Sequence, residues 1–262
     1  MKIVRGFLSL LLVSAFFISA NPTAWAADSW GADPKTGCKI AWVSDSYTIV
    51  SASWSGPIAD NKAEGKGALT VTIRGKDGKE SQGQGDAEMK AGKLDGKASI
   101  KWSDGISYDG YYKVGVREGK GVYKWPDGQI YDGEWKNGKQ SGKGVMKWPN
   151  GAIYDGDWEN DTANGQGMLK AFENDIYQGG WKNGKRDGKC IYKSPDGQIY
   201  EGDVKNDRME GKGKITYPNG AVYEGDISGL KPSGYGVLKD ASGKVLYEGE
   251  RKDVPDESAQ QF

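Results

Sequence analysis

The stretch YDGEWKNGKQSGKGVMKWPNGAI, residues 131–153, contains the unit from which most of the chain is built. It begins with a Tyr-x-Gly triplet at Tyr131, has a tryptophan at Trp135 and a Gly-x-Gly that starts at Gly142. The triplet returns every 23 residues, and a last copy follows one residue late. Its tyrosines are Tyr108, Tyr131, Tyr154, Tyr177, Tyr200, Tyr223 and Tyr247. A fixed period of this length is typical of a repeat protein whose units stack on their neighbours.

Each unit is predicted to be a β-hairpin. Residues 125–128 read Trp-Pro-Asp-Gly, which places proline at the second position of a turn and glycine where φ must be positive. The strands then flank this turn, over residues 121–125 and 129–135. The fold class we predict is all-β: an elongated, single-layer antiparallel sheet of tandem hairpins of about 23 residues.

Alternation along the strands sorts the side chains by face. Tyr131, Gly133 and Trp135 share one face, whereas Lys124 and Asp132 lie on the other. We expect the aromatic rings to lie over glycines of neighbouring strands, so that one layer can bury apolar area. The aromatic residues that this pattern makes the candidate partner-binding face are Tyr131, Trp135, Tyr154, Trp158, Tyr177, Trp181, Tyr200 and Tyr223.

The pattern Y-x-G-x-W-x-x-G-x-x-x-G-x-G, as written from Tyr131 to Gly144, closely resembles the MORN repeat. The resemblance covers about residues 54–250. Val204 and Ile227 depart from it by replacing the tryptophan, and residues 174–175 replace the proline turn with Asn-Asp. The resemblance implies an elongated sheet of successive hairpins that acts as an interaction or membrane-association module and carries no catalytic residue.

Four regions follow from these patterns. Residues 1–26 form a predicted signal peptide, and residues 27–53 a linker and capping strand. Residues 54–250 form the repeat sheet, with two divergent units, six regular units and a partial one. The first divergent unit, at Trp54, has an insertion around residues 75–84. Residues 251–262 are predicted to be a flexible tail.

The N-terminus indicates export. Basic residues precede an apolar stretch over residues 7–20, and Ala24-Trp25-Ala26 is typical of a cleavage site. A membrane anchor is the alternative, but the stretch is shorter than the ~20 residues that span a bilayer. We therefore expect a periplasmic or secreted protein that is not transmembrane after cleavage.

Composition argues against catalysis, cofactors and nucleic acid. The chain has no histidine, the commonest general base and metal ligand, and its 36 basic residues are balanced by 36 acidic ones. The acid after each repeat tyrosine is copied from unit to unit, unlike a catalytic pair. We predict no enzyme activity and no cofactor or metal.

Two functions remain open. The leading hypothesis is a scaffold whose extended sheet binds an unidentified protein partner in the cell envelope. The alternative is a glycan- or phospholipid-binding module that uses the aromatic face. We favour the interpretation that the rings are the packing layer of the sheet, because ring and glycine alternate at the positions that build it.

The two cysteines, Cys38 and Cys190, are predicted to be unpaired. Strands about 4.8 Å apart place them far apart along the sheet, whereas a disulfide needs Cα atoms within roughly 7 Å. We expect Cys38 to be the more reactive thiol because it lies near the N-terminus.

Overall fold

The computed structural model describes residues 28–44, 46–171 and 175–251. The predicted signal peptide lies outside these ranges, as does all of the predicted C-terminal tail except residue 251. Every regular element of the described residues is a β-strand, and none of these residues forms a helix able to span a membrane.

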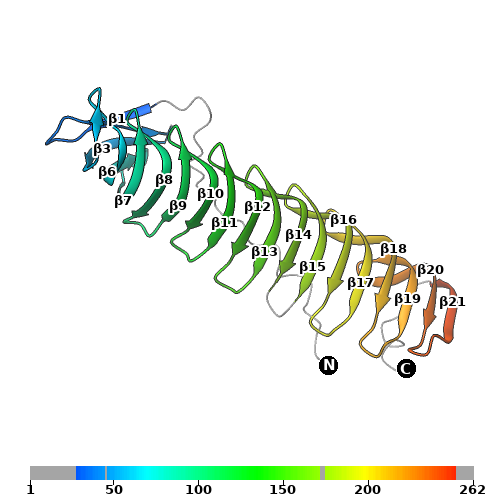
Figure 1. The fold of residues 1–262 in the computed structure, drawn as a ribbon. Helices are drawn as coiled ribbons and strands as arrows, with labels where there is room; N and C mark the ends of the chain where they lie inside the picture. The colour runs from blue at the N-terminus through cyan, green and yellow to red at the C-terminus, as the bar shows by residue number, and fades with distance from the viewer. Residues whose placement is uncertain (1–27, 45, 172–174, 252–262) are drawn as a thin grey trace.

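One antiparallel sheet runs along the whole molecule (Figure 1). Its strands pair in chain order, and β3 and β21 lie at its opposite ends, so the sheet is open. They are β3 (Tyr47–Trp54), β6 (Gly65–Gly75), β7 (Glu80–Lys90), β8 (Lys93–Trp102), β9 (Ser107–Lys113), β10 (Val116–Lys124), β11 (Ile130–Lys136), β12 (Lys139–Lys147), β13 (Ile153–Glu159), β14 (Thr162–Lys170), β15 (Ile176–Lys182), β16 (Lys185–Lys193), β17 (Ile199–Lys205), β18 (Arg208–Thr216), β19 (Val222–Ser228), β20 (Lys231–Lys239) and β21 (Val245–Arg251). The predicted fold class is confirmed.

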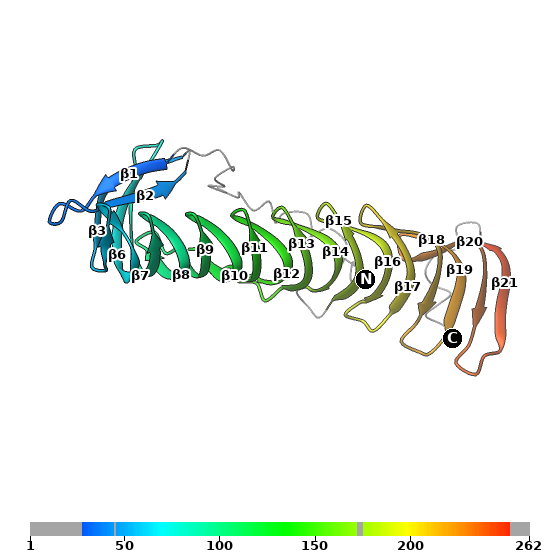
Figure 2. The same cartoon turned by 45° about the horizontal axis from the view of Figure 1, so that its top comes forward.

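A small second sheet covers the N-terminal end (Figure 2). It consists of β1 (Asp28–Ala32), β2 (Lys39–Val43), β5 (Lys62–Ala63) and β4 (Ile58–Ala59), in that order. The sequence predicted a linker and a capping strand over residues 27–53; a strand does cover this end, but β1 forms in the part expected to be a linker. Ile49, in the first strand of the long sheet, donates its N–H to the Ser29 hydroxyl at 2.9 Å.

Asp33 joins the two sheets. Its carboxylate accepts the backbone N–H of Trp54 at 2.9 Å and that of Lys35 at 2.8 Å. The side chain is only 3 % exposed. These backbone hydrogen bonds hold the pKa of Asp33 below its usual value, because they stabilise the charged form.

The proline turns form as predicted. Trp125 donates its N–H to the Gln129 carbonyl at 3.0 Å, and Gly128 has φ +91°, which glycine adopts readily. The pairing is centred so that Tyr123 faces Tyr131 and Gly121 faces Gly133. The strands are longer than predicted, because β10 begins at Val116, beyond the Gly-x-Gly.

The Gly-x-Gly is the site of a β-bulge. Between β11 and β12, Gly133 pairs with Gly144 but the next residue, Glu134, pairs with Ser141. The skipped residues include Gly142, whose φ of +64° is unfavourable for residues with a Cβ. Strands β13 and β14 repeat the same shift, so the bulge belongs to the repeat itself.

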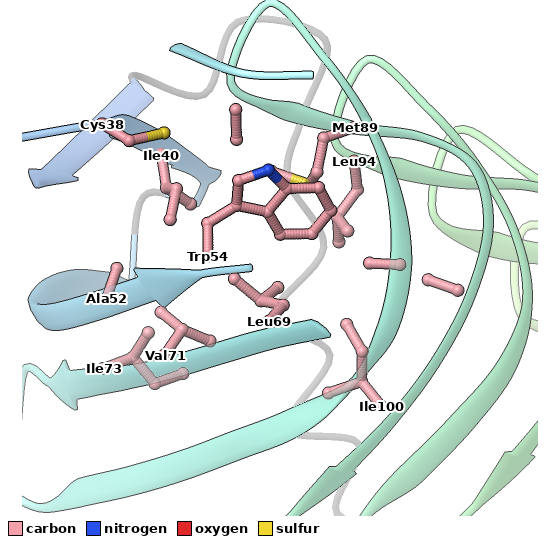
Figure 3. Close-up of a cluster of buried hydrophobic side chains, with 13 residues drawn as sticks. Cys38, Ile40, Ala52, Trp54, Leu69, Val71, Ile73, Met89, Leu94 and Ile100 are labelled. Carbon is pink, nitrogen blue, oxygen red and sulfur yellow. The ribbon is translucent and has the colours of Figure 1, made fainter. Parts of the chain in front are cut away.

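Buried side chains form three clusters. The N-terminal cluster surrounds Trp54, which lies close to Met89 and Leu94 in Figure 3. The other two follow the rows of aromatic residues along the repeats. Residues 75–84, expected as an insertion, are the extended end of the long hairpin β6–β7 and its turn.

Both thiols are free, as predicted, and they belong to different clusters. Cys38 was expected to be the more reactive thiol because it lies near the N-terminus, but that position does not expose it: Cys38 is fully buried in the N-terminal cluster. Burial raises the pKa of Cys38, and it raises that of Cys190 to about 11, so both thiols are held in the unreactive protonated form at neutral pH.

Candidate functional site

The ring face is the side of the long sheet that carries the repeat tyrosines, glycines and tryptophans. Each strand is curved (Figure 1), and within residues 28–44, 46–171 and 175–251 no second layer covers the repeats. The buried rings therefore lie on the inside of this curve. Three rows cross the strands here: tyrosines with other apolar residues, then glycines, and then tryptophans that pair with glycines.

The tyrosines are held flat over the glycine row. A Cβ on Gly133 would lie 2.6 Å from both Cζ and the hydroxyl oxygen of Tyr131, on the same strand. The ring also covers Gly144 on the neighbouring strand, as the sequence indicated. The Tyr131 hydroxyl donates to the Glu134 carbonyl at 3.0 Å, which satisfies the polar end of a side chain that is otherwise fully buried.

This hydrogen bond recurs from unit to unit. Each repeat tyrosine donates to the carbonyl three residues later, at distances from 2.7 to 3.1 Å. Burial raises the pKa of Tyr108, Tyr131, Tyr154, Tyr177 and Tyr200, in the last case to about 12, since the phenolate would lose its hydration. The donors are Tyr108, Tyr131, Tyr154, Tyr177, Tyr200, Tyr223 and Tyr247.

The tryptophans connect successive units. The Trp158 indole N–H on β13 donates to the Gly144 carbonyl on β12, which belongs to the preceding 23-residue unit, at 3.0 Å, and Trp135 and Trp181 do the same with Gly121 and Gly167. The Trp158 ring meets Tyr131 and Tyr154 edge to face, with centroids 5.3 and 5.1 Å apart. Such pairs are favourable arrangements of aromatic rings.

The eight residues proposed from the sequence therefore build the core of the sheet. Seven of them are at most 8 % exposed, and only Trp181 is half-buried. A glycan needs an open ring face on which to stack, so the buried rings cannot act together as such a platform. Alternation identified the correct face but could not show that this face curls over itself.

The charged face is the opposite side of the sheet, and its side chains are available to solvent. One row alternates lysine with isoleucine: Lys124, Lys147, Lys170 and Lys193 pair across the strands with Ile130, Ile153, Ile176 and Ile199. The next row alternates acids with apolar residues, among which Met168 is 41 % and Ile191 50 % exposed.

A third row of the charged face consists of ion pairs. Lys143 and Asp157 lie 2.6 Å apart, and Lys189–Asp203 and Lys212–Asp226 repeat the pair at 2.8 Å. Burial by itself raises the pKa of Asp157, but the hydrogen bonds from Lys143 and the Gln166 N–H outweigh it and hold the pKa below its usual value. This face is closely balanced in charge.

One row that the sequence analysis did not single out lies at the rim of the ring face. Its members Arg117, Gln140, Ala163 and Arg186 occupy the second position after a two-residue turn, which is Val-Gly before Arg117 and Asn-Gly or Asn-Asp before the other three. The Arg117 guanidinium lies 4.2 Å from the Trp135 ring centroid and donates to the Gly138 carbonyl at 2.9 Å. Their 23-residue spacing was visible, but the four positions hold three different residue types (Arg, Gln and Ala) and therefore show no shared chemistry.

Comparison with known families agrees with this arrangement. A family model described as MORN repeat matches seven segments that together make up more than half of the chain. The segments are residues 86–107, 108–130, 131–153, 154–170, 177–199, 200–222 and 223–245. The unit at Trp54 lies outside the match, which begins within β7. No curated protein matches the chain.

Proposed function

Since the chain belongs to the MORN repeat family, whose members are repeat scaffolds for protein or membrane-lipid interaction, we propose that it is a non-catalytic exported scaffold that binds a protein partner in the cell envelope. The proposal is based on the side chains that the charged face exposes. Its ion pairs and exposed apolar residues recur along the rod and offer an extended surface with little net charge.

This balance favours a protein over a polyanion. Attraction of nucleic acid or an anionic surface needs an excess of positive charge, which the carboxylates of this face offset. Exposed Met168 and Ile191 supply apolar area of the kind found at the centre of protein interfaces. The acids are repeated from unit to unit rather than placed as one pair, which supports a non-catalytic role.

Export can be tested first. The mature protein should begin at Ala27 and be found in the periplasmic or secreted fraction, as N-terminal sequencing of each fraction would show. An uncleaved chain in the cytoplasm would contradict this part of the proposal.

Partner binding can then be tested by cross-linking in envelope extracts. We expect a defined protein to be cross-linked to the native chain and lost from the Ile191→Glu variant, because a charge at the centre of an interface is costly. Glu210→Gln, in an exposed position of β18, serves as the control. Equal cross-linking of all three proteins would contradict the use of this face.

The lysine–isoleucine row supports a second candidate, binding to anionic phospholipid. Lys124, Lys147, Lys170 and Lys193 are all exposed and lie on alternate strands, about 9.6 Å apart. Co-sedimentation with phosphatidylglycerol vesicles, compared with phosphatidylcholine vesicles, would test it. Binding to the anionic vesicles alone, lost from a Lys147→Gln/Lys170→Gln variant, would favour the lipid over the protein partner.

A further inference from the structure

The three tryptophans that pair with glycines on the ring face are covered to different degrees, although their backbones are equivalent. Trp135 is 4 % exposed and Trp158 is 8 % exposed, whereas Trp181 is only half-buried. Each makes the same indole hydrogen bond to a glycine carbonyl and lies edge to face against tyrosines. The difference must therefore come from what covers the remaining ring surface.

The rim row explains the difference. Gly119 pairs with Trp135, and Arg117, two residues earlier on the same face, extends its guanidinium over the indole. In the next unit Gly142 pairs with Trp158, so Gln140 stands in the place of Arg117, and its side chain is 1 % exposed. In the third unit Gly165 pairs with Trp181, and the corresponding residue is Ala163. A methyl group cannot extend over an indole.

The molecule shows which group covers a tryptophan in such a place. Arg117 lies over Trp135 and donates to the Gly138 carbonyl at 2.9 Å. Arg186 occupies the same rim position in a unit that has Val204 in place of the tryptophan. It lies 5.5 Å from the Tyr177 ring centroid, as Arg117 lies 5.9 Å from that of Tyr108, and donates to the Asp207 carbonyl, the equivalent turn position, at 3.2 Å. The combination of an aromatic face and a turn carbonyl suits a planar, multiply donating guanidinium. At the open place the corresponding groups are the Trp181 indole and the Gly184 carbonyl.

We infer that the place left open by Ala163 is a binding site for an arginine side chain of a partner protein, which would lie over Trp181 as Arg117 lies over Trp135. The inference rests on the proposed scaffold role, since it names a group that a protein partner presents, here at the rim of the ring face rather than on the charged face. The charge of Arg186, the direct cross-strand neighbour of Trp181, does not oppose it, because Arg186 forms an ion pair with Asp207 at 3.2 Å.

The site can be tested without the partner. A capped Arg-Gly-Arg peptide is titrated into protein labelled with 15N-tryptophan, and the indole N–H signals are followed by NMR; Trp181→Phe assigns the relevant signal. We expect the Trp181 signal to shift saturably and to bind the corresponding Lys-Gly-Lys peptide at least about threefold more weakly, since lysine lacks the planar donor set. The signals of Trp135 and Trp158 should not move.

Two substitutions test the site, one by filling it and the other by opening an equivalent place over Trp135. Ala163→Arg fills it from within the chain and should abolish the Trp181 shift, whereas Ala163→Ser should leave it. Arg117→Ala opens the equivalent place, so the Trp135 signal should begin to respond to the peptide. This second variant keeps the inference testable if Ala163→Arg fails to fold, which a thermal melt would show.

A static Trp181 signal, or an Ala163→Arg protein that responds like the native one, would overturn the inference. So would an Arg117→Ala protein whose Trp135 signal does not respond. These outcomes are independent of the scaffold proposal, because the peptide experiment involves no envelope partner. Cross-linking to a partner that persists in Ala163→Arg would place that partner elsewhere on the sheet and leave the scaffold role intact.

Discussion

The hairpins of β11–β16 and those of β17–β21 share one backbone plan but differ in one row of side chains. The first region has Trp135, Trp158 and Trp181 in this row, and the second has Val204 and Ile227, which are 2 % and 3 % exposed. The tyrosine and glycine rows are present in both. The hairpin therefore requires the tyrosine that packs over its glycines. The row of tryptophans can be replaced by other apolar side chains that fill the same volume.

The two regions should nevertheless differ in stability. Edge-to-face pairs contribute about 0.5–1.5 kcal/mol beyond the area they bury, and the tryptophan region has a continuous series of them. Val204 and Ile227 bury apolar area without these pairs. Because each unit contacts only its neighbours, this difference is not averaged over the rod. We expect the β17–β21 region to open first.

The largest expected effect is the loss of both regions at high pH. Buried tyrosines whose pKa is raised stabilise the folded state fully below their unfolded pKa of about 10, and this contribution is lost as pH rises toward the folded value, about 12 for Tyr200. The tyrosine row crosses both regions, so both should unfold together between about pH 10 and 12. Absorbance at 295 nm and circular dichroism, recorded together, measure this. Tyrosines that ionise near pH 10 while the sheet stays intact would contradict it.

Truncation of a tryptophan in β11–β16 should lower the free energy of unfolding more than truncation of the equivalent aliphatic residue in β17–β21. Trp158→Ala should destabilise the protein by about 3–5 kcal/mol, because it removes buried volume, two ring pairs and the bond to Gly144. Ile227→Ala should cost less, about 2–3 kcal/mol. Trp158→Ile converts one region to the other type and should recover part of the loss. Urea unfolding of the three variants decides the order, and a larger cost for Ile227→Ala would contradict it.

Substitution of the glycine row should affect the two regions equally. A Cβ at Gly133 would meet Tyr131 at 2.6 Å, and one at Gly225 would meet the Tyr223 hydroxyl at 2.7 Å. Gly133→Val and Gly225→Val should therefore each destabilise by about 1–3 kcal/mol. Asp132→Val, on the exposed face of the same strand, is the control and should change the thermal midpoint little. A difference between the two glycine variants as large as either effect would be inconsistent with a common tyrosine–glycine plan.

The smallest expected effect concerns the carboxylates at the bulges. Asp157 accepts the Gln166 N–H at 2.8 Å in the first region, and Asp226 accepts the Tyr235 N–H at 3.0 Å in the second. Asp157→Ala should cost about 0.5–1.5 kcal/mol. The lowered pKa values mean that this contribution is present at neutral pH and is lost as pH falls below about 4. Thermal melts at pH 7 and pH 3 should show a difference between native and variant protein that is smaller at pH 3 than at pH 7.

The sequence alone determined the repeat, the hairpins and the face that carries the rings. Proline turns and alternation are local signals, and the 23-residue period repeats them. The bulge at Gly142 could not be predicted from the sequence, because a Gly-x-Gly pattern does not show which residue is left out of the cross-strand pairing. A capping strand before residue 54 was predicted, but its pairing with β1 in a separate small sheet was not, since residues 28–43 repeat nothing. The role of Asp33 depends on Trp54, twenty-one positions away.

The candidate site was harder to predict than the fold. Tyr131 and its equivalents were placed on the correct face, but exposure depends on how strongly a single layer curves, which no local pattern records. The open ring of Trp181 follows from Ala163, a residue without functional groups. Such a site can be recognised only by comparing equivalent positions once the register between strands is known.

Because the register between units is constant, the length of the sheet is set by the number of repeats. Gly133, Gly156 and Gly179 take the same place in the glycine row, so removal of residues 131–153 would join β10 to β13 with every cross-strand pair preserved in kind. The rod would become shorter by two strands, about 9.6 Å, and in other respects remain the same object. The length of the sheet therefore changes only in steps of one hairpin. A partner that binds at two separated points along the sheet would depend on the number of repeats between them rather than on a particular residue.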